Sequence, residues 1–262
     1  MRTVLWLPLL LCTTLACGSE PLRRPAQMVS DYHGTFPDAF TQQFDRVRLL
    51  TRQAQLEVSS RLGLFQYQEG FHYPIRIRFE DNAPAGLENT LAFVRLMQNS
   101  QGEFSQELVV NLNETRQGAM DFDQVFFHEM THAVLNDAVG GEASLKIPHW
   151  IQEGLAQYVS NEGEPRLRKA TAGLTRLTVH VLLCDLNGPY SSRAYPQYYL
   201  AIKYLYEKYT SNAIQALVRM LIDGKPCREA LQETTGVPWE RFQQDLHDYS
   251  LNTLKDIVGP RY

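Results

Sequence analysis

The chain has 262 residues and a formal net charge of -4, with 44% hydrophobic and 21% charged residues. This balance is that of an ordinary globular protein and excludes a disordered chain. Its slight acidity provides no basic surface for nucleic acid, so we expect no nucleic-acid partner. Four cysteines are too few for a fold held together by disulfides.

The N-terminus has the pattern of an export signal. Arg2 precedes an apolar run from Val4 to Leu11, and small residues follow that run. The apolar run is shorter than the roughly 20 residues that a membrane-spanning helix needs. We therefore predict a signal peptide over residues 1–16.

The end of this signal resembles the lipobox of bacterial lipoproteins. The segment from Thr14 to Ser19 surrounds Cys17, although Thr14 stands where that family prefers Leu. The resemblance implies that Cys17 is lipidated, becomes the first mature residue and anchors the protein to a membrane. Because Gly18 rather than Asp follows, it implies a cell-envelope protein on the outer membrane, facing the periplasm. Ordinary secretion is the alternative.

The mature chain should begin with a tether over residues 17–31, which is polar and contains proline. A helix is expected over Phe36–Leu62, because apolar residues recur there at steps of three and four. Three strand-like runs follow, at Ile75–Phe79, Leu91–Leu96 and Leu108–Leu112. The first alternates between apolar and polar residues, so we expect it to be half-buried.

From Asp121 onward the apolar spacing is helical. Gly140 with Gly141 should end the first helix of this region and Gly163 the second. A few strands followed by many helices predict an α+β fold rather than a doubly wound sheet. The predicted helices are Phe122–Asn136, His149–Ser160, Arg166–Leu183, Gln197–Tyr209, Asn212–Ile222, Arg228–Thr235 and Trp239–Ile257.

The first of these helices carries a metal-binding pattern. His128 and His132 are four residues apart, so their imidazoles point from one face of the helix. Two neutral imidazole nitrogens suit one zinc ion. Glu129 follows directly in this HExxH motif and is placed to hold a metal-bound water and to accept its proton.

A catalytic zinc needs a third protein ligand, and three residues qualify. Glu142 lies in the loop after the helix, His149 begins the next helix, and Glu153 lies one turn further on. Near the last of these, Gly154 and Ala156 would let the second helix approach the HExxH helix closely. Glycine inside a helix otherwise costs about 1 kcal/mol, so it needs a packing reason.

The HExxH motif, followed by Pro148-x-Trp-x-x-Glu-Gly-x-Ala-x-Tyr158, resembles the gluzincin metallopeptidases, in particular the bacterial peptidase MA-like group. The resemblance implies His128, His132 and Glu153 as ligands of one Zn²⁺ and Glu129 as the general base. Related enzymes place an acidic residue one turn after the third ligand to orient a histidine. Gln157 occupies that position here, so the orienting group is open.

The resemblance also implies a zincin-like fold. A small twisted sheet would pack on the HExxH helix in a subdomain over residues 32–160, and a helical subdomain would follow over residues 161–262. Members similar to this chain often carry a tyrosine at the position of Tyr195, whose phenol would stabilise the reaction's oxyanion. Tyr198 is the alternative residue for stabilising the oxyanion. The other tyrosines of this segment should form a packing stripe.

We therefore expect a secreted or lipid-anchored zinc metallopeptidase that hydrolyses peptide bonds of a peptide or protein substrate. The substrate would pair with an edge strand at Leu91–Leu96. The alternative is a non-enzymatic envelope lipoprotein, an adaptor or binding module that retains a zincin fold. In an oxidising periplasm Cys184 and Cys227 should form a disulfide, with two free thiols as the alternative.

Overall fold

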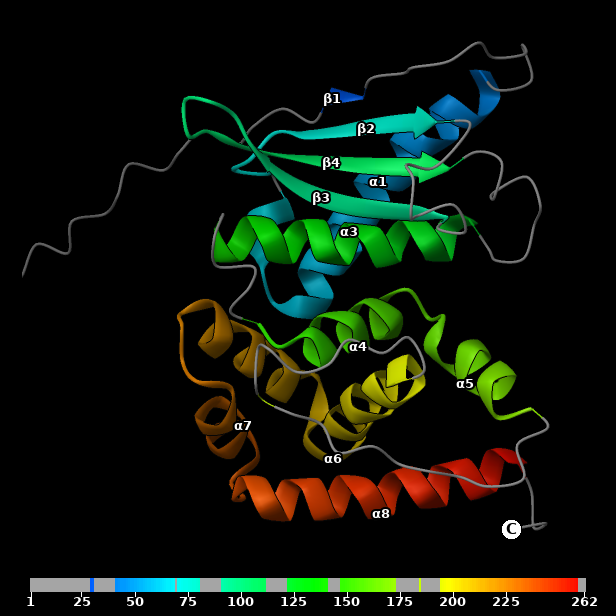
Figure 1. Ribbon diagram of the computed structural model, residues 1–262, viewed down its shortest axis with the longest axis vertical. Coiled ribbons are helices and arrows are strands. Elements are labelled where there is room, and N and C mark those ends of the chain that lie inside the picture. The colour runs from blue at the N-terminus through cyan, green and yellow to red at the C-terminus, as the bar shows by residue number, and fades with distance from the viewer. Residues whose placement is uncertain are drawn as a thin grey trace, which may run out of the picture.

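The computed structural model describes residues 29–30, 41–68, 70–80, 91–111, 122–140, 147–172, 184 and 194–258. These residues form a mixed α+β fold, as predicted, in which a small sheet is followed by helices (Figure 1). The strands are β1 (Val29–Ser30), β2 (Ile75–Glu80), β3 (Ala92–Gln98) and β4 (Phe104–Asn111). The helices are α1 (Thr41–Leu62), the single 3₁₀ turn η2 (Phe65–Gln68), α3 (Phe122–Val139), α4 (His149–Val159), α5 (Gly163–Thr171), α6 (Tyr195–Ile222), α7 (Cys227–Thr235) and α8 (Trp239–Val258).

The sheet has the strand order β1-β2-β4-β3. Strands β1, β2 and β4 are parallel, and β3 returns antiparallel to β4, with Val94 opposite Leu108. Within the described residues β3 is therefore an edge strand, as the sequence predicted for this segment.

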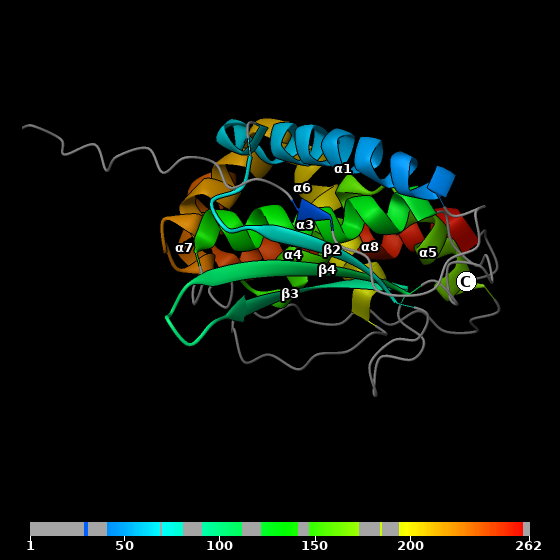
Figure 2. The same ribbon diagram turned by 90° about the horizontal axis from the view of Figure 1, so that it is seen from above.

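Helix α3 lies between the sheet and the helical half of the molecule. In Figure 1 the edge strand β3 is the strand nearest to α3, and α4 lies on the other side of α3. Figure 2 shows α1 running beside α3. Helices α6, α7 and α8 complete the helical half below α4. One core cluster runs from buried residues of the sheet, such as Leu108, through α3 to buried residues of α6, such as Ile202.

A buried aspartate ties the end of α3 to the start of the sheet. The carboxylate of Asp137 accepts hydrogen bonds from the backbone N–H of His72 at 2.8 Å and of Tyr73 at 2.6 Å, just before β2. It also lies 2.9 Å from Nδ1 of His72. Further along, the side-chain amide of Gln106 in β4 donates to the carbonyl of Ala133 in α3 at 3.1 Å. These bonds set how α3 lies against the sheet.

Helix α4 packs closely against α6, and Gly154 makes that approach possible. A Cβ at this position would lie 2.5 Å from the carbonyl oxygen of Tyr198 and 2.7 Å from Cγ1 of Ile202. The sequence assigned this glycine to an approach between α4 and the HExxH helix. That assignment is wrong, because the bare backbone faces α6 instead.

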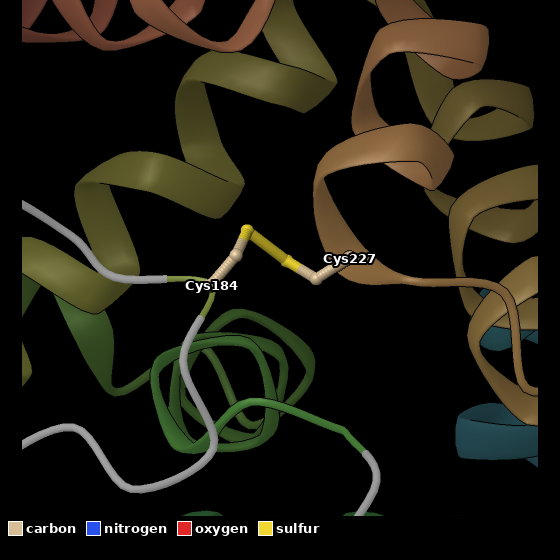
Figure 3. The surroundings of a disulfide bond; sticks show 2 residues. All are labelled: Cys184 and Cys227. Carbon is tan, nitrogen blue, oxygen red and sulfur yellow. A yellow bond between two sulfur atoms is a disulfide. The ribbon is translucent and has the colours of Figure 1, made fainter.

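A disulfide joins Cys184 to Cys227 at the start of α7, as predicted (Figure 3). The two cysteines are separated by 43 positions in the sequence. A bridge that closes a loop of this length stabilises a protein by roughly 2–4 kcal/mol.

Most predicted elements are confirmed, with differences at their ends. Helix α1 is described from Thr41, so the predicted start at Phe36 lies outside the described residues, as do 17–28 and 31 of the tether. Val29 and Ser30, which we assigned to that tether, pair with β2. Gly163 does not end α4 but begins α5. Helix α5 ends at Thr171, and Ala172 has a non-helical conformation. The helix predicted over Arg166–Leu183 is therefore wrong at Ala172.

The two helices predicted before and after Thr210 form the single element α6, which breaks at that residue. Thr210 has φ 77° and ψ 171°, outside the helical region. No helix among the described residues is both long enough and apolar enough to cross a membrane.

Substituting Gly154 by alanine tests the contact between α4 and α6. In a solvent-exposed helix this change stabilises the protein by up to about 1 kcal/mol. Here the added methyl meets backbone at Tyr198, so we expect the free energy of unfolding to fall by about 1–3 kcal/mol. Urea unfolding followed by circular dichroism measures the difference. A Gly154→Ala variant as stable as the wild type, or more stable, would contradict the close approach.

Candidate metal centre

Two histidines of α3 form the first half of the site. His128 and His132 are one helical turn apart, and their Nε2 atoms lie 3.2 Å from each other. Both side chains are mostly buried, with exposed fractions of 11% and 16%. Polar rings at this depth need partners, because unpaired buried polar groups are costly.

Helix α4 supplies the third group. Oε2 of Glu153 lies 3.4 Å from Nε2 of His128, and Oε1 lies 3.5 Å from Nε2 of His132. One ligand atom from each of the three residues lies within 4.8 Å of the other two. The described residues therefore contain a possible metal-binding triad, made by the residues that the resemblance implied.

Of the other two candidates for the third ligand, His149 is not part of this triad. Nδ1 of His149 lies 3.9 Å from Oε1 of Glu153, and its ring packs 5.8 Å from the rings of Tyr195 and Tyr198. His149 thus lies beside Glu153, on the side of the two tyrosines. Glu142 lies outside the described residues.

Glu129 lies next to the triad and faces the sheet. Its side chain is buried and accepts a backbone hydrogen bond from Val94 of the edge strand β3. The carboxylate that the motif assigns as a base is therefore placed between the metal-binding group and the edge strand β3.

A third carboxylate, which the sequence did not single out, completes the site. Oε1 of Glu162, just before α5, lies 2.5 Å from Nδ1 of His128. Glu162 is 1% exposed, and its Oε2 lies 3.0 Å from Nη2 of Arg166. The only sequence signal is an acidic residue four positions before an arginine, which is common on helix surfaces.

The side chain that lies behind His128 is thus Glu162, whereas Gln157 bonds elsewhere. The buried amide of Gln157 donates to the carbonyl of Tyr195 at 3.0 Å and to that of Glu153 at 3.2 Å. Gln157 therefore links α4 to the start of α6, and it fixes the main chain at Tyr195.

The first three tyrosines of α6 divide into two groups. Tyr195 and Tyr198 pack on each other and on His149 at the site. Tyr199 packs with Leu167 and Leu254 in a second core cluster. The packing role predicted for most of the stripe holds for this residue.

Burial and neighbouring charges drive the pKa values of the site apart. Burial opposes a charge on His128, but hydrogen bonds to Glu153 and Glu162 outweigh it and raise its pKa to about 10. Burial lowers the pKa of His132 to about 4. For Glu153, burial is outweighed by the two histidines, which lower its pKa to about 2. Burial raises the pKa of Glu129 to about 8. The protein without metal therefore holds a proton on His128.

The donor set fits a divalent ion that accepts nitrogen and oxygen. Two imidazoles and one carboxylate converge from two helices, and a further carboxylate holds the outer nitrogen of His128. Such an arrangement is typical of zinc sites that leave a position open for water or substrate.

Comparisons with known proteins identified no relative of this chain. No family model matches the chain, and neither a curated protein nor a solved structure matches it.

Metal binding should release protons, because the proton on His128 competes with the metal for Nε2. At pH 7.5 His132 is already neutral and Glu153 is already ionised, so His128 is the ligand that must lose a proton. We expect release of one to two protons per zinc, including a fraction from Glu129, and therefore an affinity that rises by about ten- to a hundredfold per pH unit between pH 6 and 8.

Calorimetric titration of the metal-free protein with zinc, in buffers of different protonation enthalpy, counts these protons. Binding without proton release, or affinity that does not change with pH, would show that His128 carries no extra proton in the metal-free protein.

Proposed function

We propose that this protein is a zinc-dependent metallopeptidase of the gluzincin type with a zincin-like fold. The convergence of His128, His132 and Glu153 from two helices, with the buried carboxylate of Glu129 beside them, is the observation that carries the proposal. A triad of this composition together with an adjacent general base is the minimum that hydrolysis by an activated water requires.

The three ligands would hold one zinc ion, which when bound acidifies water to a pKa of about 7 and polarises a carbonyl. Glu129 would supply the proton transfer. Burial raises its pKa to about 8 without metal, and the positive charge of an ion at the triad lowers it. The carboxylate is then ionised near neutral pH, and it can take a proton from the attacking water and pass it to the leaving amine.

The edge strand β3 supports a peptide as the substrate. The backbone carbonyl of Leu91 accepts from the backbone N–H of Asn111, and the backbone N–H of Asn99 donates to the carbonyl of Glu103. The odd-numbered residues of β3 are therefore the ones that bond to β4. By the alternation of an antiparallel pair, the even-numbered residues, Val94 among them, turn their backbone groups to the other edge. Because the backbone N–H of Val94 already bonds Glu129, an extended peptide would pair with the other even-numbered residues of this edge, next to Glu129.

Tyr195 is the proposed group for the oxyanion. Its ring lies at the site beside His149, and Gln157 fixes its main chain. Tyr198 has a similar place, with its ring 5.7 Å from that of Tyr195. A phenol donor would stabilise the charge that develops on the carbonyl oxygen.

We propose a cell-envelope location with Cys17 as the lipid anchor. The disulfide between Cys184 and Cys227 supports export, because such bonds persist in oxidising compartments. Substituting Cys17 by alanine should release the protein from the membrane fraction. Unchanged membrane association and an unchanged mature mass would count against the anchor.

Substitutions at the site separate ligands from base. Alanine at His128, His132 or Glu153 should lose zinc and turnover together. Glu129→Gln should keep zinc and fold but lose nearly all turnover of an unstructured protein substrate. Metal content by mass spectrometry and cleavage assays measure both quantities.

His149→Ala is the matched comparison for the third ligand. It should bind zinc normally. Zinc binding that survives Glu153→Ala but not His149→Ala would make the gluzincin assignment wrong. Zinc-loaded wild-type protein that cleaves nothing in a proteome-wide comparison with Glu129→Gln would favour the non-enzymatic alternative.

The variant Tyr195→Phe removes only a hydroxyl group. If that group serves the transition state, turnover should fall by roughly ten- to a thousand-fold while zinc content stays the same. Tyr198→Phe is the parallel variant, and we expect a smaller effect from it. Wild-type turnover in Tyr195→Phe would reduce this residue to a packing role.

A further inference from the structure

The short turn between α4 and α5 carries Glu162 to the face of His128 that points away from the triad. Nε2 of His128 faces His132 and Glu153, whereas Nδ1 meets Oε1 of Glu162. A carboxylate oxygen only accepts, so the proton of this hydrogen bond belongs to Nδ1. Because Nδ1 keeps this proton, Nε2, which faces the triad, is the nitrogen that gives up its proton when a metal binds.

The main chain of this turn is fixed by two helices that lie far away in the sequence. Nη1 of Arg61 in α1 donates to the carbonyl of Val159 at 2.9 Å and to Oδ1 of Asn161 at 3.4 Å. The side-chain amide of Gln124 in α3 donates to the carbonyl of Asn161 at 3.4 Å. Asn161 has φ 59°, a left-handed conformation in which asparagine is among the more tolerant residues.

The residue after Glu162 is pressed against α6. A Cβ at Gly163 would lie 2.0 Å from Cδ2 of Tyr199, so no other residue fits without moving the ring. The same relation holds one helix earlier, where Gly154 follows Glu153 and lies against Tyr198. Each of the two glutamates that meet His128 is thus followed by a glycine that sits on α6.

Arg166 holds the outer oxygen of the carboxylate. Its Nη2 lies 3.0 Å from Oε2 of Glu162, which leaves Oε1 directed at His128. The carboxylate is therefore fixed at both oxygens and through the backbone on either side.

We propose that Glu162 is a positioning residue that fixes the tautomer and the ring orientation of His128, so that Nε2 is presented to the metal. The inference rests on the metal site of the proposed function, although it does not require that the protein cleave peptides. Hydrogen-bonded carboxylates behind a histidine ligand increase metal affinity, and their loss typically weakens it by 10–100-fold.

The experiment compares the zinc affinity of the full mature chain and three variants, by competition with a chromophoric chelator. Glu162→Ala should bind zinc about 10–100-fold more weakly than the wild type. Glu162→Gln keeps an acceptor but loses the charge, so its affinity should fall by a smaller factor. Glu164→Gln is the matched control, because Glu164 pairs with Arg168 on the exposed side of α5, and its affinity should be unchanged.

Nuclear magnetic resonance of zinc-loaded protein with ¹⁵N-labelled histidine gives a readout that a purely structural role would not change. The wild type should show a protected Nδ1–H signal for His128, and Glu162→Ala should lose it. A variant that loses stability but keeps wild-type zinc affinity and this signal overturns the proposal. If Glu162→Ala does not fold, wild-type affinity in Glu162→Gln overturns it instead.

This comparison is independent of turnover. If the wild type binds zinc and Glu162→Ala weakens that binding, the positioning role stands even where no peptide is cleaved, and only the proposed activity fails. If the wild type binds no zinc, the metal site and the positioning role both fail.

Discussion

Burial of three carboxylates around two histidines is the condition on which the arrangement of this protein depends. Glu129, Glu153 and Glu162 are at most 9% exposed, and each would be costly to bury as an unpaired charge. The site is stable because each carboxylate has a partner: Val94 for the first, the histidines for the second, and His128 with Arg166 for the third. The strand and the helices that carry these partners must therefore all be in place together.

Helix α6 provides the surface that satisfies this condition. Its consecutive residues Tyr198 and Tyr199 pack against Gly154 and Gly163. The residue before each of these glycines is a glutamate that contacts His128. The distance from α6 to α4 and to the following turn therefore determines where both carboxylates lie. On the other side, Asp137 ties α3 to the sheet, so that the histidines and the edge strand β3 keep their positions relative to each other.

The elements could be predicted from the sequence because their signals are local. Apolar spacing identified α3, α4 and the later helices, and the three longer strands appeared as short runs between turn residues. The motif with two histidines four residues apart also depends only on the geometry of one helix. The residue that completes the triad, Glu153, came from resemblance to a family, since spacing alone left Glu142 and His149 open.

The sequence by itself determined the α+β class, the order of the main elements and the two imidazoles of one helical face. Only the tertiary structure decided that Glu162 rather than Gln157 lies behind His128, and that Gly154 faces α6 rather than α3. The physical reason is that these contacts join residues whose proximity depends on how several helices pack together. Arg61 meets Asn161 and Gly163 meets Tyr199 across long stretches of chain, and no period or motif in the sequence encodes such a distance.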